Sequence, residues 1–165
     1  MLILVSKYVT SSVVRMNYST LPEYFEVLPL CCVLQSNDTD DEVAPICSNL
    51  LAVLAYTITI DQVMPSALQA MRKVATCPFW SARAVITEFM SGFVFHNMAT
   101  IISKKEWVLD IQQMVLELLE DIQPEVRISA SQVLSGLLHC QFLPNPEELL
   151  VSWCVVPDGV TVFDL

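Results

Sequence analysis

Two histidines, six cysteines and a group of carboxylates are the residues of this 165-residue sequence whose types could support catalysis or metal binding. His139 precedes Cys140, and these two residue types cooperate in nucleophilic catalysis. Adjacent residues on a helix point apart, however, so this pair is not expected to form a dyad. His96 lies in an apolar stretch without Asp, Glu or Cys at the spacing of a metal site. We therefore interpret both histidines as ordinary core or surface residues and predict no catalytic residue, no metal site and no cofactor.

The carboxylates Glu117, Glu120 and Asp121 lie close together in the sequence. Paired carboxylates can act as general acid and base, but at a helix end we interpret them as a solvated face. The three glycines are too far apart for a phosphate-binding loop. Ser91-Gly92 and Ser135-Gly136 fall within predicted helices, which is the wrong context for a nucleophile turn. The sequence therefore predicts a protein that is not an enzyme.

The charge of the chain is strongly negative, with eight basic residues, eighteen acidic residues and a formal net charge of −10. Nucleic-acid binding needs clustered Lys and Arg, so we predict no direct nucleic-acid contact. The cysteines show no C-x-x-C spacing and have apolar neighbours, where free Cys behaves as a small hydrophobe. This usage is typical of a reducing compartment. The cysteines are Cys31, Cys32, Cys47, Cys77, Cys140 and Cys154.

The elements that must position these residues are helices, because apolar residues recur at intervals of three and four almost throughout. Ser103 and Glu106 have the spacing of a capping box, and Pro124 suits a first helical turn. After Cys154 the sequence is β-branched with a Pro157-Asp158-Gly159 turn signal, which indicates a small hairpin or a loose tail. We expect helices over residues 2–18, 22–35, 41–59, 61–75, 79–98, 104–120, 124–140 and 146–154.

The composition is unusually apolar, with 54% hydrophobic residues and a mean hydropathy of +0.54. Either part of the chain lies in a membrane, or the helices have faces that neighbours cover. Val43 to Ile60 is uncharged and close to the roughly 20 residues that span hydrocarbon. Pro45, Ser48 and Asn49 interrupt it, and no Lys/Arg cluster flanks it, so we favour a buried helix and predict no membrane contact.

The sequence of one predicted helix is repeated within the chain. "WSARAVITEFMSGFV" begins at Trp80 and "PEVRISASQVLSGLL" begins 44 residues later, at Pro124. Arg83 and Gly92 of the first copy align with Arg127 and Gly136 of the second. A period near 40 to 47 residues with paired antiparallel helices describes HEAT-type repeats. A glycine kept within a helix suggests that the backbone passes close to a neighbour there, with tolerance of loose packing as the alternative. We expect the two arginines to bond turn carbonyls or an acid of the adjacent repeat.

The stretch from Pro78 to Leu143 resembles the C-terminal part of the very large HEAT-repeat proteasome activators. The residues that carry the resemblance are Trp80, Arg83, Val94-Phe95, Asn97, Leu118-Leu119-Glu120-Asp121, Glu125-Val126-Arg127, Leu134-Ser135-Gly136-Leu137-Leu138, Cys140 and Phe142. Residues 1–77 fit more loosely. The resemblance implies a subunit that binds the proteasome core particle, opens its gate and promotes ubiquitin-independent degradation. It also implies links to acetylated core histones, DNA repair and spermatogenesis, and a location in nucleus and cytoplasm.

A bromodomain-like region is assigned within this family, and here it would cover residues 76–165. The acetyl-lysine contact of the family is an Asn-Phe pair, which corresponds to Gln141 and Phe142 of this chain. Gln is one methylene longer than Asn and carries the same amide, so a contact with the acetyl carbonyl is one interpretation of Gln141. A surface residue at a helix end is the other.

We thus expect HEAT-like repeats over residues 1–143 and a divergent helix and tail over 144–165. Family members end in a hydrophobic-Tyr-x tail, whereas this sequence ends Val162-Phe163-Asp164-Leu165. We therefore expect a piece of a longer activator, unable to bind the core particle by itself. A different α-solenoid scaffold or adaptor, with no proteasome link, is the alternative, and a membrane-associated helical protein is a second one.

Overall fold

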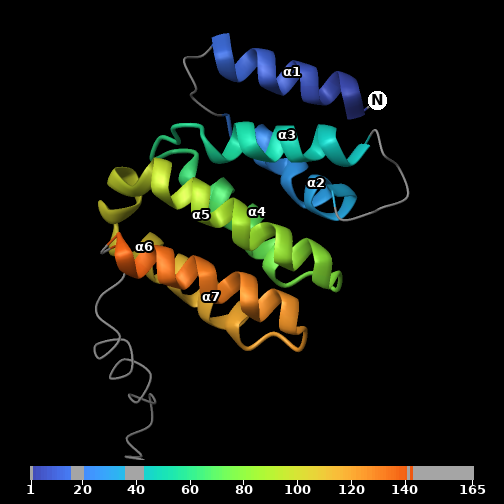
Figure 1. Cartoon of the computed structure of the whole chain (residues 1–165). Coiled ribbons are helices and arrows are strands. Elements are labelled where there is room, and N and C mark those ends of the chain that lie inside the picture. The colour runs from blue at the N-terminus through green and yellow to red at the C-terminus, as the bar shows by residue number, and fades with distance from the viewer. Residues whose placement is uncertain (1, 16–20, 36–42, 141, 143–165) are drawn as a thin grey trace, which may run out of the picture.

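The computed structural model describes residues 2–15, 21–35, 43–140 and 142, and these residues form helices joined by turns (Figure 1). The all-α prediction is thereby confirmed. A 3-10 helix η1 (Pro22–Val27) leads directly into α2. The α-helices are α1 (Leu2–Arg15), α2 (Leu28–Gln35), α3 (Val43–Ala55), α4 (Met64–Ala75), α5 (Trp80–Ile102), α6 (Lys105–Leu119) and α7 (Pro124–His139).

The helices form two layers. In one layer α1, α3, α5 and α7 follow one another from the top to the bottom of Figure 1, and each contacts the next. In the other layer α2 contacts α4, and α4 contacts α6. The pairs α2–α3, α4–α5 and α6–α7 contact each other across the layers. Short links between contacting helices produce antiparallel pairs, and stacked pairs form an α-solenoid. The predicted HEAT-like solenoid is therefore the observed arrangement.

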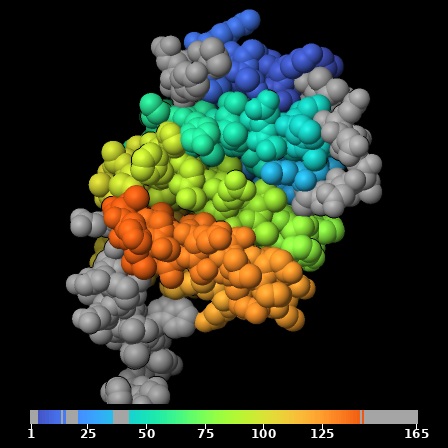
Figure 2. Space-filling view, in the orientation of Figure 1, coloured from blue at the N-terminus to red at the C-terminus, as the bar shows by residue number. Residues whose placement is uncertain are grey.

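The layer of α3, α5 and α7 also forms one face of the molecule. Figure 2 shows these helices as successive bands, α3 in cyan, α5 in yellow-green and α7 in orange. The repeated sequences form the N-terminal part of α5 and almost the whole of α7. They thus occupy equivalent places in consecutive helix pairs.

The core is continuous from α1 to α7, and α5 lies at its centre, in contact with helices of both layers. Its Phe93 is fully buried, with its ring edge-on to Phe25 of η1 and stacked on Phe89, both at 5.8 Å between centroids. Burying one such side chain contributes about 1.5–3 kcal/mol. Because α5 is covered on several sides, it carries apolar residues around most of its circumference.

The ends of several helices differ from the prediction. The helix expected over 41–59 ends at Ala55. The Thr57 hydroxyl donates to the Leu54 carbonyl at 2.7 Å, and the Thr57 carbonyl and the Thr59 N–H bond the side chain of Asn97 on α5 instead of continuing the helix. The segment 22–35 begins as a 3-10 helix rather than an α-helix. The helix expected over 146–154 and the tail after Cys154 lie outside the described residues.

The predicted capping box at Ser103 is wrong. The residue before the first turn of α6 is Lys104, and no side chain caps this end. The Ser103 hydroxyl instead donates backwards to the carbonyl of Thr100 at 2.6 Å. Ser103 still has the backbone angles of the preceding helix, φ −64° and ψ −21°, so its hydroxyl faces the end of α5 and not the start of α6.

The apolar stretch that begins at Val43 is a core helix. α3 has 13 residues and is therefore about 20 Å long, against about 30 Å of membrane hydrocarbon. Its Cys47, Leu50 and Leu54 are fully buried. Among the described residues only α5 has the length and composition to cross a membrane, and 44% of its most apolar window is already buried within the protein.

Candidate interaction surfaces

Successive helix pairs are joined by polar contacts with a constant separation in the sequence. In three contacts the partners are 38 residues apart, and the residues are Thr59 with Asn97, Arg72 with Asp110, and Arg83 with Asp121. Arg72 and Arg83 both join the pair α4–α5 to the pair α6–α7, and Asn97 joins α5 to the turn after α3. The polar contacts therefore fix how neighbouring helix pairs lie on each other.

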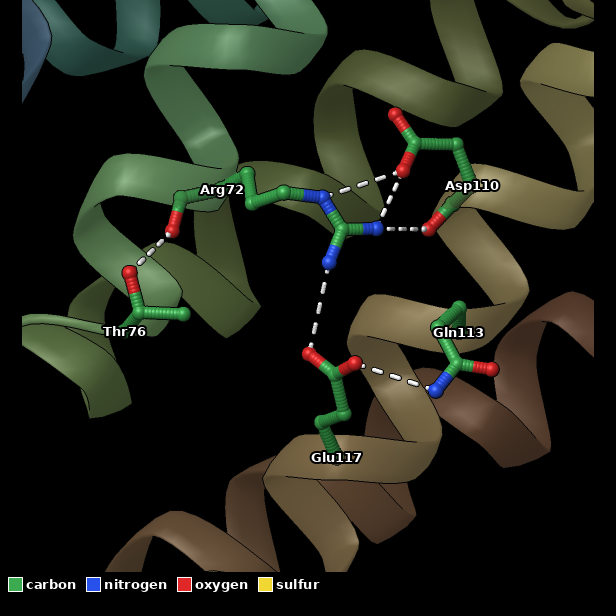
Figure 3. Close-up of polar contacts among 5 residues, drawn as sticks. All are labelled: Arg72, Thr76, Asp110, Gln113 and Glu117. Atoms are coloured by element: carbon green, nitrogen blue, oxygen red, sulfur yellow. Dashed lines mark hydrogen bonds and ion pairs between the residues drawn. The ribbon is translucent and has the colours of Figure 1, made fainter.

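Arg72 on α4 joins two carboxylates of α6, as Figure 3 shows. Its Nε donates to Oδ1 of Asp110 at 3.1 Å, and its Nη1 donates to Oε2 of Glu117 at 3.4 Å. The other oxygen of Glu117 accepts from Gln113 at 3.0 Å. The three charged side chains are 32–43% exposed, so water screens them and each pair contributes about 1 kcal/mol or less.

Arg83 on α5 forms a more buried contact with Asp121, in the turn between α6 and α7. Its Nη2 donates to Oδ1 of Asp121 at 2.8 Å and its Nε to Oδ2 at 2.5 Å. The two side chains are 12% and 8% exposed. The hydrogen bonds from Arg83 hold the pKa of Asp121 below its usual value, and Asp121 in turn raises the pKa of Arg83.

Both repeated arginines also hold the turn that precedes their own helix. Arg83 Nη1 donates to the Cys77 carbonyl at 2.8 Å, and Arg127 Nη1 donates to the Asp121 carbonyl at 2.8 Å. Arg127 donates in addition to the Ile122 carbonyl at 3.0 Å. The expectation that these arginines bond turn carbonyls or an acid of the adjacent repeat is confirmed, since Arg83 does both and Arg127 does the first.

The carboxylates that the sequence groups together are separated by the structure. Glu120 is exposed, as expected for a solvated residue. Glu117 pairs with Arg72, and Asp121 is buried in its contact with Arg83. The prediction of one solvated face is therefore wrong for Asp121. The reason is tertiary, because Arg83 of the preceding helix pair comes within hydrogen-bonding distance of this turn.

Asn97 supplies a contact that the sequence analysis did not find as a site. Its side chain is 2% exposed, and its backbone angles, φ −111° and ψ 15°, mark a kink within α5. Oδ1 accepts from the Thr59 N–H at 2.6 Å, and Nδ2 donates to the Thr57 and Phe93 carbonyls at 2.9 and 3.0 Å. The side-chain amide of Asn97 thus pairs with backbone groups of the turn after α3 and with a carbonyl of its own kinked helix. Asn97 was quoted only for the family resemblance.

The two repeated glycines have different surroundings. A Cβ on Gly92 would lie 3.3 Å from the Cβ of Ala55 on α3, so α5 approaches its neighbour closely there. A Cβ on Gly136 would meet no described atom within 4 Å. The predicted close approach is confirmed for Gly92, whereas the described residues provide no such neighbour for Gly136.

The residues with metal-binding potential lie apart from one another within the described part of the chain. No group of three or more His, Cys, Asp or Glu residues there could hold a metal ion. His96 and His139 are exposed, and Nδ1 of each hydrogen-bonds a carbonyl four residues earlier, of Gly92 and Ser135. Cys31, Cys32 and Cys47 are fully buried, and burial raises the pKa of the Cys31 thiol to about 12.

Phe142 follows α7 and is 5% exposed, with its N–H bonded to the Leu137 carbonyl at 3.0 Å. Its ring belongs to the same core cluster as Val133 and Leu137 of α7. Gln141, the other residue of the proposed acetyl-lysine contact, lies outside the described residues. The structure therefore places one member of this pair, and places it in the core.

Two hollows lie between the helices of the layer that contains α3, α5 and α7. One, of about 130 Å³, lies between α3 and α5 beside the end of α2, and the other, of about 300 Å³, lies between α5 and α7. Val85, Glu88 and Phe89 line the first, and Ser129, Gln132 and Val133, each 44 residues later, line the second. The hollows are therefore equivalent features of successive repeats, which the sequence pattern alone did not reveal.

Stacked helix pairs, a constant register and a face with repeated hollows define the class of this protein. It is an α-solenoid of HEAT-like repeats, a class that works by presenting extended surfaces to other macromolecules. No protein-family model matches the chain. Comparison with characterised proteins nevertheless identifies its relatives, and the chain belongs to the proteasome activator complex subunit 4 family.

The similarity extends along most of this chain and a small part of each relative. The chain is 32% identical to proteasome activator complex subunit 4A of Danio rerio over 148 residues, which is 88% of this chain and 8% of that protein. It is 30% identical to proteasome activator complex subunit 4 of Homo sapiens over 133 residues, 81% of this chain and 7% of that protein. For the protein of the same name from Xenopus laevis the identity is 31% over 140 residues.

Proposed function

We propose that this chain serves as a structural segment of a proteasome activator and takes part in binding the proteasome core particle, opening its gate and promoting ubiquitin-independent degradation. The observation that carries the proposal is the 30–32% identity to proteasome activator subunits over more than four-fifths of the chain. The fold supports a role of this kind, since polar contacts join neighbouring helix pairs of the stack. In a solenoid each repeat contacts its neighbours, so such a segment holds the adjoining repeats in place and adds to the binding surface of the whole protein.

A chimaera tests this proposal. The matched segment of the Homo sapiens protein is replaced by the corresponding residues of this chain, and stimulation of the core particle is measured with a fluorogenic peptide. We expect the chimaera to stimulate peptide hydrolysis, and the chimaera carrying Asp121→Ala to lose stimulation because two helix pairs lose their contact. A folded chimaera without stimulation would favour a non-proteasomal α-solenoid scaffold or adaptor.

Recognition of acetylated histones is a second part of the proposal, at Gln141 and Phe142 at the C-terminal end of α7, together with the nuclear and cytoplasmic location that such a role requires. The support is the resemblance of the Gln141-Phe142 pair to the Asn-Phe pair of the family, with Phe142 itself 5% exposed. An acetylated histone-tail peptide is titrated against the chain, with the unacetylated peptide as control. We expect Gln141→Ala to weaken binding of the acetylated peptide alone. Equal binding of the two peptides would contradict this role.

A further inference from the structure

The hollow between α3 and α5 has the features of a binding pocket for one side chain. It is bounded by the last residue of α2, by α3 and by the first half of α5, and its volume is about 130 Å³. A cavity of about 150 Å³ accommodates a benzene molecule, so this one accommodates a group of similar size. The lining residues are Gln35, Ser48, Leu51, Ala52, Ala55, Tyr56, Val85, Glu88, Phe89 and Gly92.

Two side chains of this pocket offer hydrogen-bond acceptors that the described residues leave open. The Oε1 atom of Gln35 is buried and accepts no hydrogen bond from the described part of the chain. A buried acceptor left unpaired costs about 1–3 kcal/mol, which a donor from a ligand would recover. Glu88 is exposed, and none of the described basic side chains forms an ion pair with it. The pocket therefore requires a ligand that donates hydrogen bonds and carries positive charge.

The remaining walls are suited to an alkyl chain and a flat cation. Leu51, Ala52, Ala55 and Val85 provide apolar surface beside the acceptors. Long basic side chains bury their alkyl stems on such surface while the charged head reaches polar groups. Tyr56, which also lines the pocket, offers an aromatic ring, and guanidinium groups stack on aromatic rings. A guanidinium carries five N–H donors, more than the three of an ammonium group, and so fits several separate acceptors better.

The equivalent hollow between α5 and α7 is also lined by hydrogen-bonding side chains, so polar sites recur from one repeat to the next. Glu88 lines both hollows, with Ser91 and Gln132 beside it in the second. None of the residues that line either hollow is basic. Neighbouring helix axes are about 8–10 Å apart. An extended chain in the polyproline II conformation advances about 3.1 Å per residue with three residues per turn, so its side chains three positions apart lie on the same side, about 9 Å from each other. Two side chains that enter successive hollows would therefore be about three residues apart in an extended peptide.

We propose that the pocket formed by Gln35, Ser48, Tyr56 and Glu88 binds an arginine side chain of a basic, extended segment of a partner protein, with a second polar residue three positions away in the hollow between α5 and α7. The net charge of −10 attracts such a segment over longer range. The site goes beyond the proposed role in proteasome activation and does not depend on it.

The test uses a fluorescein-labelled Gly-Ser peptide with arginine at every third position, and its binding to the full chain is measured by fluorescence anisotropy. We expect saturable binding, at least about tenfold weaker with Glu88→Gln and with Gln35→Leu, because each removes one partner of the guanidinium. Glu120→Gln, which changes the net charge equally at the end of α6, is the matched control and is expected to bind as the unaltered chain does.

Two further measurements make the test specific. Gln35→Leu removes an unpaired buried acceptor, so the variant is expected to melt at the same or a higher temperature while losing the peptide. A peptide with citrulline in place of arginine has the same shape without the charge and is expected not to bind. Equal weakening by Glu88→Gln and Glu120→Gln would show general charge attraction and overturn the pocket. If the citrulline peptide, or a peptide with lysine in place of arginine, binds as tightly as the arginine peptide, the assignment of the pocket to a guanidinium group is overturned.

Discussion

Arg83 on α5 and Asp121 in the turn before α7 form a bidentate ion pair between successive helix pairs, with N–O distances of 2.8 and 2.5 Å. Arg83 also holds its own turn through the Cys77 carbonyl, so one guanidinium fixes two turns of the solenoid. Arg127 has the same relation to its own turn through the Asp121 carbonyl. The contact thus links one repeat to the next at one edge of the stack.

Removal of the carboxylate is expected to destabilise the chain strongly. Asp121→Ala leaves the largely buried guanidinium of Arg83 without its partner, and breaking such a pair costs about 3–5 kcal/mol. Glu120→Ala removes an exposed neighbour and is expected to change stability by about 0.5 kcal/mol or less. The free energy of unfolding in urea compares the two variants. Similar losses for both would contradict the role of the buried pair.

The same pair predicts a dependence of stability on pH. The pKa of Asp121 is lower in the folded chain than in the unfolded chain, because Arg83 donates to the ionised carboxylate. Its stabilisation is therefore complete above about pH 4, the ordinary range of an Asp, and is lost as the pH falls through the folded-state value. We expect the difference in unfolding free energy between the unaltered chain and Asp121→Asn to stay constant from pH 7 to about pH 5 and to shrink as the pH falls from about 4 to 2.5. A difference that stays constant down to about pH 2.5 would show that the charge of Asp121 contributes nothing.

The two repeated glycines are expected to respond differently to the same substitution. Gly136→Ala places a methyl group where no described atom lies within 4 Å, so the higher helix propensity of Ala should stabilise the chain by about 0.5–1 kcal/mol. Gly92→Ala gains the same propensity but brings its Cβ to 3.3 Å from Ala55. It is therefore expected to gain less or to destabilise. Thermal unfolding of the two variants decides, and an equal gain from both would show that α3 and α5 separate without cost.

The cysteines are expected to differ in reactivity. Cys31 is fully buried with a pKa raised to about 12, and burial also raises the pKa of Cys32 and Cys47. The thiolate is the reactive form, so at pH 8 only about one Cys31 in ten thousand is ionised. Cys140 is exposed. We expect iodoacetamide to modify Cys140 at least about a hundred times faster than Cys31. Mass spectrometry of the proteolytic peptides measures the two rates. Unfolding in urea should abolish the difference, and equal rates in the folded chain would contradict the buried placement.

Much of the fold follows from local features of the sequence. Apolar spacing at three and four located the helices, and the starts of α5 and α7 lie at Trp80 and Pro124, where the repeat begins. The repeat at 44 residues indicated stacked pairs, because a helix pair with one apolar side is stable only against a similar neighbour. The ends were less predictable. α3 ends early because Thr57 and Thr59 bond groups distant in the sequence, as Asn97 shows.

By itself, then, the sequence determined an all-α chain, its repeat and the proteasome activator family, because these depend on periodicity and on residue identity. Only the tertiary structure decided that Asp121 is paired rather than solvated, and that Gly92 has a close neighbour while Gly136 has none among the described residues. It also decided that Gln35 and Glu88 line one pocket. The physical reason is that each of these properties depends on a residue some 35 to 55 positions away, and the register between helix pairs sets that neighbour.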